Sequence, residues 1–120
     1  MAFDDLVAAA RSAVASRQRV TPLKELREKT SSAPAARDVA SVLRAPGRVV
    51  SVIAEVKRAT ATFADLSGVG DVAVLARFYE AGGAACVSVV TEPVRSHGRL
   101  TDLDAVREAV NVPVLANDVI

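Results

Sequence analysis

The stretch from residue 49 to residue 57 reads VVSVIAEVK, and it decides the fold that we expect. Its apolar residues are small or β-branched and follow one another almost without a break, so a first strand is predicted over residues 49–56. A strand that is buried on both faces has this composition, and such strands are usually parallel. Two shorter runs of the same kind follow, Cys86–Val90 and Val112–Leu115. The sequence therefore predicts three short strands of one parallel sheet.

Helical patterns separate the predicted strands. A helix over residues 72–81 ends at two glycines, which is where glycine commonly stops a helix. A second helix is predicted over residues 101–109, with Thr101 and Asp104 at the spacing of a capping box. The order strand, helix, strand, helix, strand is typical of parallel βαβ units with right-handed crossovers. The predicted fold class is therefore α/β.

The chain before the first strand has a different pattern. Apolar residues recur there at spacings of three and four, which predicts helices over residues 3–17 and 21–29. A third helix is predicted over residues 36–43, and Ala45, Pro46 and Gly47 end it. Thr21 is expected to cap the second of these helices, with Pro22 at its first position. We therefore expect residues 1–48 to be a helical extension and residues 49–120 to be one incomplete α/β domain.

Composition and charge exclude several classes of protein. The 120 residues are 51% hydrophobic and 24% charged, which is not the composition of a disordered chain. Fifteen basic and fourteen acidic side chains give a net charge of +1, which favours neither nucleic acid nor an anionic membrane surface as a partner. No window approaches the roughly 18 apolar residues of a membrane helix, and the first 20 residues lack the apolar stretch of a signal peptide. A cytoplasmic protein is expected.

The single cysteine supports that expectation weakly. Cys86 has no second cysteine with which to form an intramolecular disulfide, which suits a reducing compartment. It lies within an apolar run, so we expect a small buried hydrophobic side chain and not a nucleophile.

Charged side chains close the first predicted strand. Glu55 and Lys57 are two residues apart, so they share a face of the strand. A lysine beside a carboxylate can act as a general acid, and its ammonium attracts phosphate or carboxylate anions. An ordinary salt bridge at a strand end would have the same spacing, so the spacing leaves both interpretations open.

Polar residues also follow the other two strands. Thr91 and Glu92 come after the second strand, and Asn117 and Asp118 come after the third. Any loop offers such residues, so they are weak indicators of a site. The one histidine, His97, lies in the loop after the second strand, and no cluster of residues gives it the spacing of a metal ligand. We expect it to be solvated.

Several segments resemble one known family. Residues 52–59, VIAEVKRA, are similar to the first-strand signature of the indole-3-glycerol phosphate synthase family. The segments that follow in the same order as in that family are YEAGGA at 79–84, VSVVTE at 87–92, LDAVR at 103–107 and VPVL at 112–115. The resemblance extends over residues 1–120. It implies a partial (β/α)₈ TIM barrel, with an N-terminal helical extension, the first three of eight strands and two helices.

The resemblance also implies a chemistry. The family is a group of lyases that close the ring of a carboxyphenylamino-deoxyribulose phosphate with loss of CO₂ and water, in tryptophan biosynthesis, and they need no metal or organic cofactor. By resemblance, Glu55 matches an active-site glutamate. Lys57 matches a lysine that contacts the substrate and assists acid catalysis. Thr60 stands where the family has a serine near the substrate, so Lys57 and Thr60 are expected to bind the substrate.

The sequence departs from the family at three places. Residues 60–63 read TATF where the family has Ser-Pro-Ser-Lys, and Ser96, His97 and Gly98 stand where it has a phenylalanine and two glycines. The phenylalanine forms an aromatic wall of the family's pocket. Asn117 replaces a lysine that is a principal general acid, and an asparagine has no proton to donate at neutral pH.

Length decides what we expect of the chain by itself. A barrel of this kind takes about 250 residues, and its phosphate site is typically built after strands seven and eight. The expected protein is therefore a truncated synthase, inactive alone, which would bind a small phosphorylated substrate if it were completed. The alternative is a non-catalytic half-barrel module that associates with another chain or with itself through open strand edges. A half-barrel relative of another phosphate-handling enzyme is a third interpretation, against which the first-strand motif argues.

Overall fold

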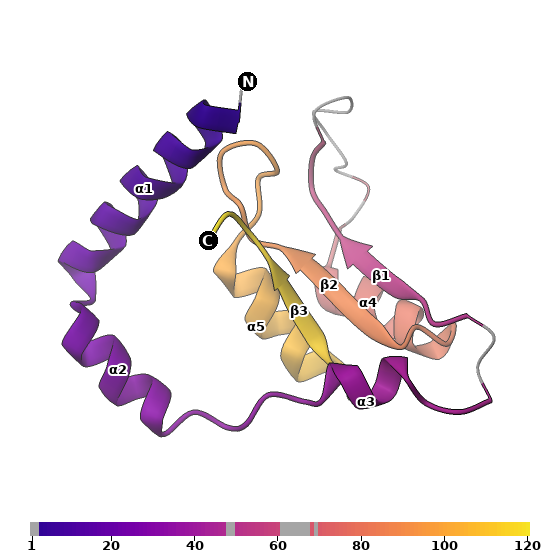
Figure 1. The fold of residues 1–120 in the computed structure, drawn as a ribbon. Coiled ribbons are helices and arrows are strands. Elements are labelled where there is room, and N and C mark those ends of the chain that lie inside the picture. Colours follow the sequence, from indigo (N-terminus) through magenta and orange to yellow (C-terminus); the bar gives the residue numbers. More distant parts are fainter. Residues whose placement is uncertain (1–2, 48–49, 61–67, 69) are drawn as a thin grey trace. The chain divides into compact units, whose positions relative to one another are not determined.

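The computed structural model of the chain describes residues 3–47, 50–60, 68 and 70–120 (Figure 1). The chain divides into two compact units, one that runs to Ala36 and includes Val119 and Ile120, and one from Arg37 to Asp118. The boundary predicted between residues 48 and 49 lies outside the described residues and stays a prediction.

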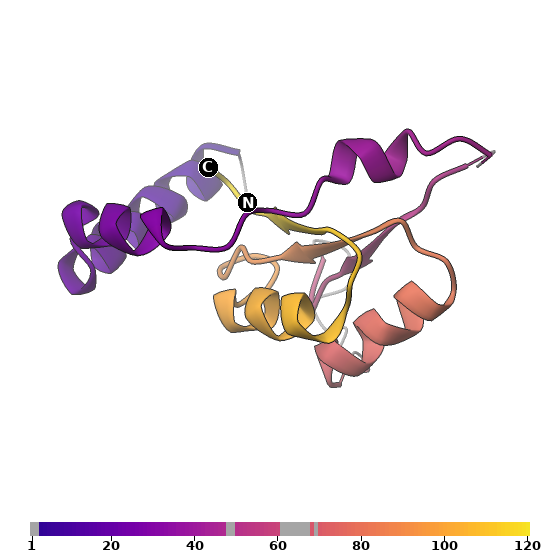
Figure 2. The same cartoon turned by 90° about the horizontal axis from the view of Figure 1, so that it is seen from below.

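The second unit, from Arg37 to Asp118, is built on a parallel three-stranded sheet. The strands β1 (Ile53–Val56), β2 (Cys86–Val90) and β3 (Val114–Asn117) lie side by side in the order of the sequence. Helix α4 (Val72–Ala81) connects β1 to β2, and α5 (Leu100–Ala109) connects β2 to β3. Both helices cover the same side of the sheet (Figure 2). The predicted parallel α/β architecture is confirmed.

The core of this unit lies between the sheet and these two helices. Side chains alternate across a strand, so every second residue of each strand points to the helices. We call this side of the sheet the helix face. Its most deeply buried side chains are those of Val56, Val87 and Val89 from the strands, with Ala76 of α4 and Val106 of α5 packed on them. Burial of this apolar surface is the main force that stabilises the unit.

The opposite side of the sheet, which we call the site face, is less covered. It carries Ile53 and Glu55 from β1, Ser88 from β2, and Leu115 and Asn117 from β3. The short helix α3 (Val39–Leu43) lies on this side and contacts β2 (Figure 2). Ile53 and Leu115 nevertheless stay 47% and 44% exposed. Part of the apolar surface on the site face is therefore exposed to solvent.

The strand ends differ from the predicted ones. Val50 and Val52 precede β1 and are exposed, while Val49 lies outside the described residues. The third strand begins at Val114, two residues later than predicted, and extends to Asn117. The nitrogen of Val112 donates to the Glu80 carboxylate at 2.9 Å. The next residue, Pro113, has no N–H, so it joins the ladder only through its carbonyl oxygen, which accepts from the nitrogen of Val87 at 3.0 Å.

The N-terminal ends of α4 and α5 are built differently. Asp71 caps α4 by accepting from the nitrogens of Ala73 at 2.8 Å and Val74 at 3.3 Å. The predicted capping box of α5 is wrong, because the helix begins at Leu100 and its N-cap is Arg99, whose side chain makes no capping bond. Thr101 therefore lies inside the helix.

A close backbone approach explains why α5 begins early. A Cβ at Gly98 would stand 2.3 Å from the carbonyl oxygen of Val90, so only glycine fits there. The Gly98 nitrogen donates to the Glu92 carbonyl oxygen at 2.9 Å. The chain thus lies against the end of β2 at Gly98, and α5 begins at Leu100 after one extended residue, Arg99.

The first unit contains α1 (Phe3–Val20) and α2 (Leu23–Ser31), close to the predicted ranges. Pro22 is the N-cap of α2 and not its first helical residue, and no side chain caps this helix. Thr21 does not cap it either, because its nitrogen still donates to the Arg17 carbonyl oxygen at 2.8 Å as a continuation of α1. No described residue of α1 or α2 is buried. Over the described part of the chain, no helix has the length and apolarity needed to cross a membrane.

The segment around α3 is held to the second unit by Arg37. Its guanidinium donates to the carbonyl oxygens of Val110 at 2.6 Å and Val112 at 2.9 Å, just beyond the C-terminal end of α5. Asp38 caps α3, and the hydrogen bonds from Ser41 lower the pKa of its carboxyl group. Residues 37–47 therefore belong to the packed α/β unit.

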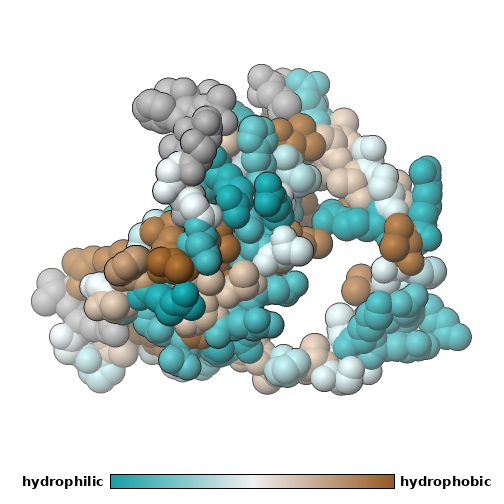
Figure 3. Space-filling model, turned by 180° about the vertical axis from the view of Figure 1, so that it is seen from behind, coloured by the Kyte–Doolittle hydropathy of each residue, from teal (hydrophilic) through white to brown (hydrophobic). Residues whose placement is uncertain are grey.

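Some apolar surface stays exposed on the outer side of the helices. Val74 and Phe78 of α4 are exposed large hydrophobic residues. The view from the side of α4 and α5 shows hydrophobic patches among hydrophilic surface (Figure 3). The helices of this unit are thus not uniformly polar on their outer faces.

Candidate active site at the ends of the strands

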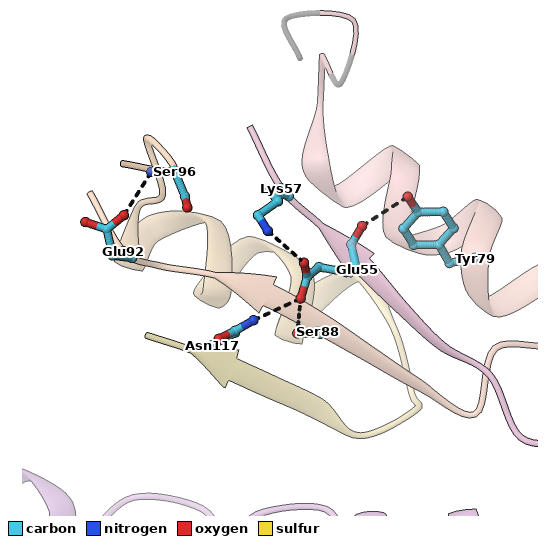
Figure 4. A network of polar contacts seen from close by, with 7 residues as sticks. All are labelled: Glu55, Lys57, Tyr79, Ser88, Glu92, Ser96 and Asn117. Atoms are coloured by element: carbon cyan, nitrogen blue, oxygen red, sulfur yellow. Dashed lines mark hydrogen bonds and ion pairs between the residues drawn. The ribbon is translucent and has the colours of Figure 1, made fainter. Parts of the chain in front are cut away.

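A polar cluster forms on the site face, with members from all three strands (Figure 4). Glu55 of β1 is the register partner of Ser88 in β2, and Asn117 is the partner of Val90, one pleat further along. Lys57 follows β1 directly. Parallel strands carry their C-terminal ends to one edge, so these side chains meet although they are up to 62 residues apart in sequence.

The Glu55 carboxylate is the centre of the cluster. Its Oε2 accepts hydrogen bonds from Ser88 Oγ at 3.1 Å and from Asn117 Nδ2 at 3.0 Å. Its Oε1 faces Lys57 Nζ at 3.5 Å. Glu55 and Lys57 thus share a face, as their spacing predicts. Their catalytic role stays a prediction.

The exposure of this ion pair limits its contribution to the stability of the fold. The side chains of Glu55 and Lys57 are 35% and 34% exposed. Solvent and salt screen an ion pair of this exposure, so the attraction between the two charges adds little to folding. An accessible ammonium beside a held carboxylate can instead donate a proton or bind an anion.

Lys57 and its neighbour Arg58 turn to opposite sides of the sheet. The Arg58 guanidinium makes two bonds to the Asp102 carboxylate in the first turn of α5, at 2.7 Å and 2.8 Å. These hydrogen bonds raise the pKa of Arg58, and only 9% of the Asp102 side chain is exposed. The pair ties the end of β1 to α5 and thereby fixes the backbone that carries Lys57.

Thr60 lies in the loop after β1 and is half-buried. The residues that follow it in the departure from the family pattern, 61–63, lie outside the described part of the chain. A contact between Thr60 and a substrate stays a prediction.

The polar residues after β2 organise a loop. Glu92 is buried, and its carboxylate accepts from the backbone nitrogens of Val94, Arg95 and Ser96 at 2.6 Å, 2.8 Å and 2.8 Å. Thr91 Oγ1 donates to Asp118 Oδ2 at 2.8 Å, which joins the ends of β2 and β3. Glu92 therefore holds the loop after β2, and Thr91 with Asp118 joins the ends of β2 and β3.

His97 and Cys86 agree with the sequence-based expectations. His97 is exposed in the loop after β2, with a positive φ of 53°. Cys86 is fully buried, and burial raises the pKa of its thiol, which disfavours the reactive thiolate. Among the described residues, no three His, Cys, Asp or Glu side chains lie together as a metal site would require.

Ser88 was not predicted as a member of the cluster, and Asn117 was interpreted as the loss of a lysine and not as a partner of Glu55. Ser88 is a polar residue in the middle of an otherwise apolar run. It is the register partner of Glu55, so the two side chains lie on the same face of the sheet. That interruption was the available signal. The sequence holds no comparable signal for the hydrogen bond from Asn117 to Glu55, because that bond depends on the register of β3.

Comparisons with known proteins identify the family. The family model described as indole-3-glycerol phosphate synthase matches residues 3–120. Curated proteins of that name are similar over almost the whole chain: 48% identical over 118 residues in Mycolicibacterium gilvum, 47% over 116 in Mycobacterium avium and 46% over 118 in Mycolicibacterium smegmatis. The matches cover 97–98% of this chain but only 42–43% of those relatives. The three-stranded sheet accordingly corresponds to a part of an α/β barrel, and the chain belongs to the indole-3-glycerol phosphate synthase family.

Proposed function

We propose that residues 1–120 supply the first part of an indole-3-glycerol phosphate synthase site and do not turn over substrate by themselves. In this proposal Lys57 contacts the anionic substrate and donates a proton during ring closure. Glu55 holds the Lys57 ammonium in place. Thr60 contributes a hydroxyl near the substrate.

The observation that carries the proposal is the placement of Lys57. Its ammonium stands 3.5 Å from Glu55 Oε1 at the C-terminal end of β1 and remains accessible. Enzymes with (β/α)₈ barrels carry their chemistry at the C-terminal ends of the strands, built from several strands at once. A lysine that is oriented there can stabilise developing negative charge and protonate a leaving oxygen.

The inactivity of the 120-residue polypeptide follows from what this part of the barrel contains. Phosphate sites of such barrels are typically built after the seventh and eighth strands, and this chain corresponds to 43% of the length of its relatives. Asn117 also offers no titratable proton at a strand end where an acid is expected. Lys57 alone would face a substrate whose phosphate group is not held.

A graft tests this proposal. Residues 1–120 are joined to the part of the Mycolicibacterium gilvum relative that follows its matched segment, with and without Asn117→Lys. Single-turnover assays follow the loss of the carboxyphenylamino-deoxyribulose phosphate. We expect no product above the no-protein rate from the 120-residue polypeptide and clear turnover from the Asn117→Lys graft. A folded but inactive Asn117→Lys graft would overturn the assignment, and product from the polypeptide alone would overturn its inactivity.

The open edges of the sheet favour a second candidate, a module that associates with another chain. The strands β1 and β3 are the two edges of the sheet, and within them Ile53 and Leu115 are 47% and 44% exposed. Unpaired edges with apolar neighbours promote pairing between chains. Light scattering during size-exclusion chromatography should find association that increases with concentration. A monomer at all concentrations that unfolds cooperatively would contradict this candidate.

A further inference from the structure

The Glu55 carboxylate divides its two oxygens between different kinds of donor. Oε2 accepts from two uncharged groups, Ser88 Oγ at 3.1 Å and Asn117 Nδ2 at 3.0 Å, and Oε1 faces the Lys57 ammonium at 3.5 Å. Two donors on one oxygen fix the rotation of the carboxylate plane. The other oxygen is thereby kept directed at Lys57.

The ladder fixes Asn117 in the position from which it donates. Its carbonyl oxygen accepts from the nitrogen of Thr91 at 3.0 Å, and the neighbouring Asp118 accepts from the Thr91 hydroxyl at 2.8 Å. The backbone of Asn117 is thus bound to the end of β2, while its side chain reaches across β2 toward β1. Its carboxamide carries no charge and no titratable proton, so any effect on chemistry must pass through Glu55.

We propose that Asn117 is a positioning residue, which with Ser88 holds Glu55 so that one carboxylate oxygen stays on Lys57. The significance for turnover rests on the proposed function, in which Lys57 is the proton donor. The positioning itself is a property of these 120 residues and can be measured on them. A lysine at residue 117 would bring a second cation, whereas Asn117 orients Glu55 and leaves Lys57 as the single ammonium of the cluster.

The first measurement tests the contact. The chain has only three side-chain amides, those of Gln18, Asn111 and Asn117, so their NH₂ signals in a ¹⁵N–¹H NMR spectrum can be resolved and assigned. Glu55→Gln removes the carboxylate with little change of shape. We expect it to shift the Asn117 pair and to leave the Gln18 and Asn111 pairs in place. An Asn117 pair that does not move would overturn the proposal.

The second measurement tests the effect on Lys57. The chain has three lysines, and Lys24 on α2 serves as the internal reference for acetic anhydride labelling followed by mass spectrometry. Without the hydrogen bond from residue 117, Lys57 should label about two- to three-fold faster relative to Lys24, because a carboxylate that is free to rotate protects the ammonium less. Asn117→Ala and Asn117→Leu, which keeps nearly the shape of asparagine without its amide, should both show the increase, whereas Asn111→Ala should not.

A double-mutant cycle separates positioning from general loosening of the fold. If Asn117 acts through Glu55, Asn117→Ala has no further effect on Lys57 labelling once Glu55 is changed to Gln. Additive increases would overturn the proposal, as would equal labelling in wild type and Asn117→Leu. Neither measurement uses turnover. An inactive graft would therefore defeat the proposed function without touching this inference, and unchanged labelling would defeat this inference alone.

Discussion

The two faces of the sheet are formed by the same three strands, yet they differ in how far their side chains are covered by the rest of the unit. The helix face is closed within the chain, since Val56, Val87 and Val89 pack on α4 and α5 and are fully buried. The site face carries an exposed ion pair and apolar side chains that remain nearly half exposed. The helix face thus provides the apolar core that stabilises the fold, whereas polar and apolar side chains of the site face remain exposed to solvent.

Two neighbouring residues show the division most directly. Lys57 turns to Glu55 on the site face, and Arg58 turns to Asp102 of α5 on the other side. Changes on the site face should therefore impair turnover in a completed barrel while they leave folding intact. Changes on the helix face should instead lower the stability of the fold.

The largest effect is expected for Lys57→Met in the Asn117→Lys graft. The change keeps most of the apolar stem but removes the charge and the proton donor, so the rate should fall on the order of 10²-fold or more. Single-turnover rates and urea melting curves should be compared with those of Lys24→Met, a lysine on α2. Unchanged rate and stability would mean that Lys57 forms only an ordinary salt bridge.

Asp102→Asn should weaken folding most among the changes on the helix face. It leaves the Arg58 guanidinium, only 24% exposed, without its carboxylate, which costs about 3 kcal/mol for a largely buried pair. Urea denaturation of the 120-residue chain measures the loss. Asp104→Asn, an exposed aspartate in the same helix, is the matched control. If the two variants have equal midpoints, the pair does not stabilise the fold.

A pair of truncations in the sheet contrasts the two faces directly. Val89 is 0% exposed on the helix face, so Val89→Ala should lower the free energy of unfolding by about 2 kcal/mol. Leu115 is 44% exposed on the site face, so Leu115→Ala should cost less than about 0.5 kcal/mol in the chain alone. The same leucine should become costly in the graft, where further strands would cover it. A large loss for Leu115→Ala in the free chain would mean that the site face is already packed.

The smallest effect is a gain at the start of α5. Arg99 is the N-cap with an extended backbone, φ −139° and ψ 140°, and its side chain makes no capping bond. Arg99→Ser supplies a hydroxyl that can accept from the first turn, which should stabilise the fold by about 1 kcal/mol. Arg95→Ser, in the exposed part of the preceding loop, controls for the loss of one positive charge. Equal stability of the two variants would show that the N-cap is not limiting.

Local pattern was sufficient for most elements of the second unit. The ranges of α4 and β2 are as predicted, because helical periodicity and β-branched runs are read within a few residues. The errors lie where distant residues intervene. Thr101 has the spacing of a capping box, but the approach of Gly98 to the end of β2 moves the start of α5. The start of β3 is likewise set by its pairing with β2, which begins with the bond from the Val87 nitrogen to the Pro113 carbonyl oxygen at 3.0 Å.

The candidate site shows the same limit. The spacing of Glu55 and Lys57 places them on one face of a strand, since side chains alternate with a period of two. The sequence thus determined by itself the parallel α/β class and the shared face of Glu55 and Lys57. Only the tertiary structure decided which side chains meet there. Ser88 and Asn117 contact the Glu55 carboxylate, and Arg58 contacts Asp102. Those contacts join residues 33 to 62 positions apart, and the register between strands and the packing of α5 on the sheet are set by the whole unit and not by any local segment.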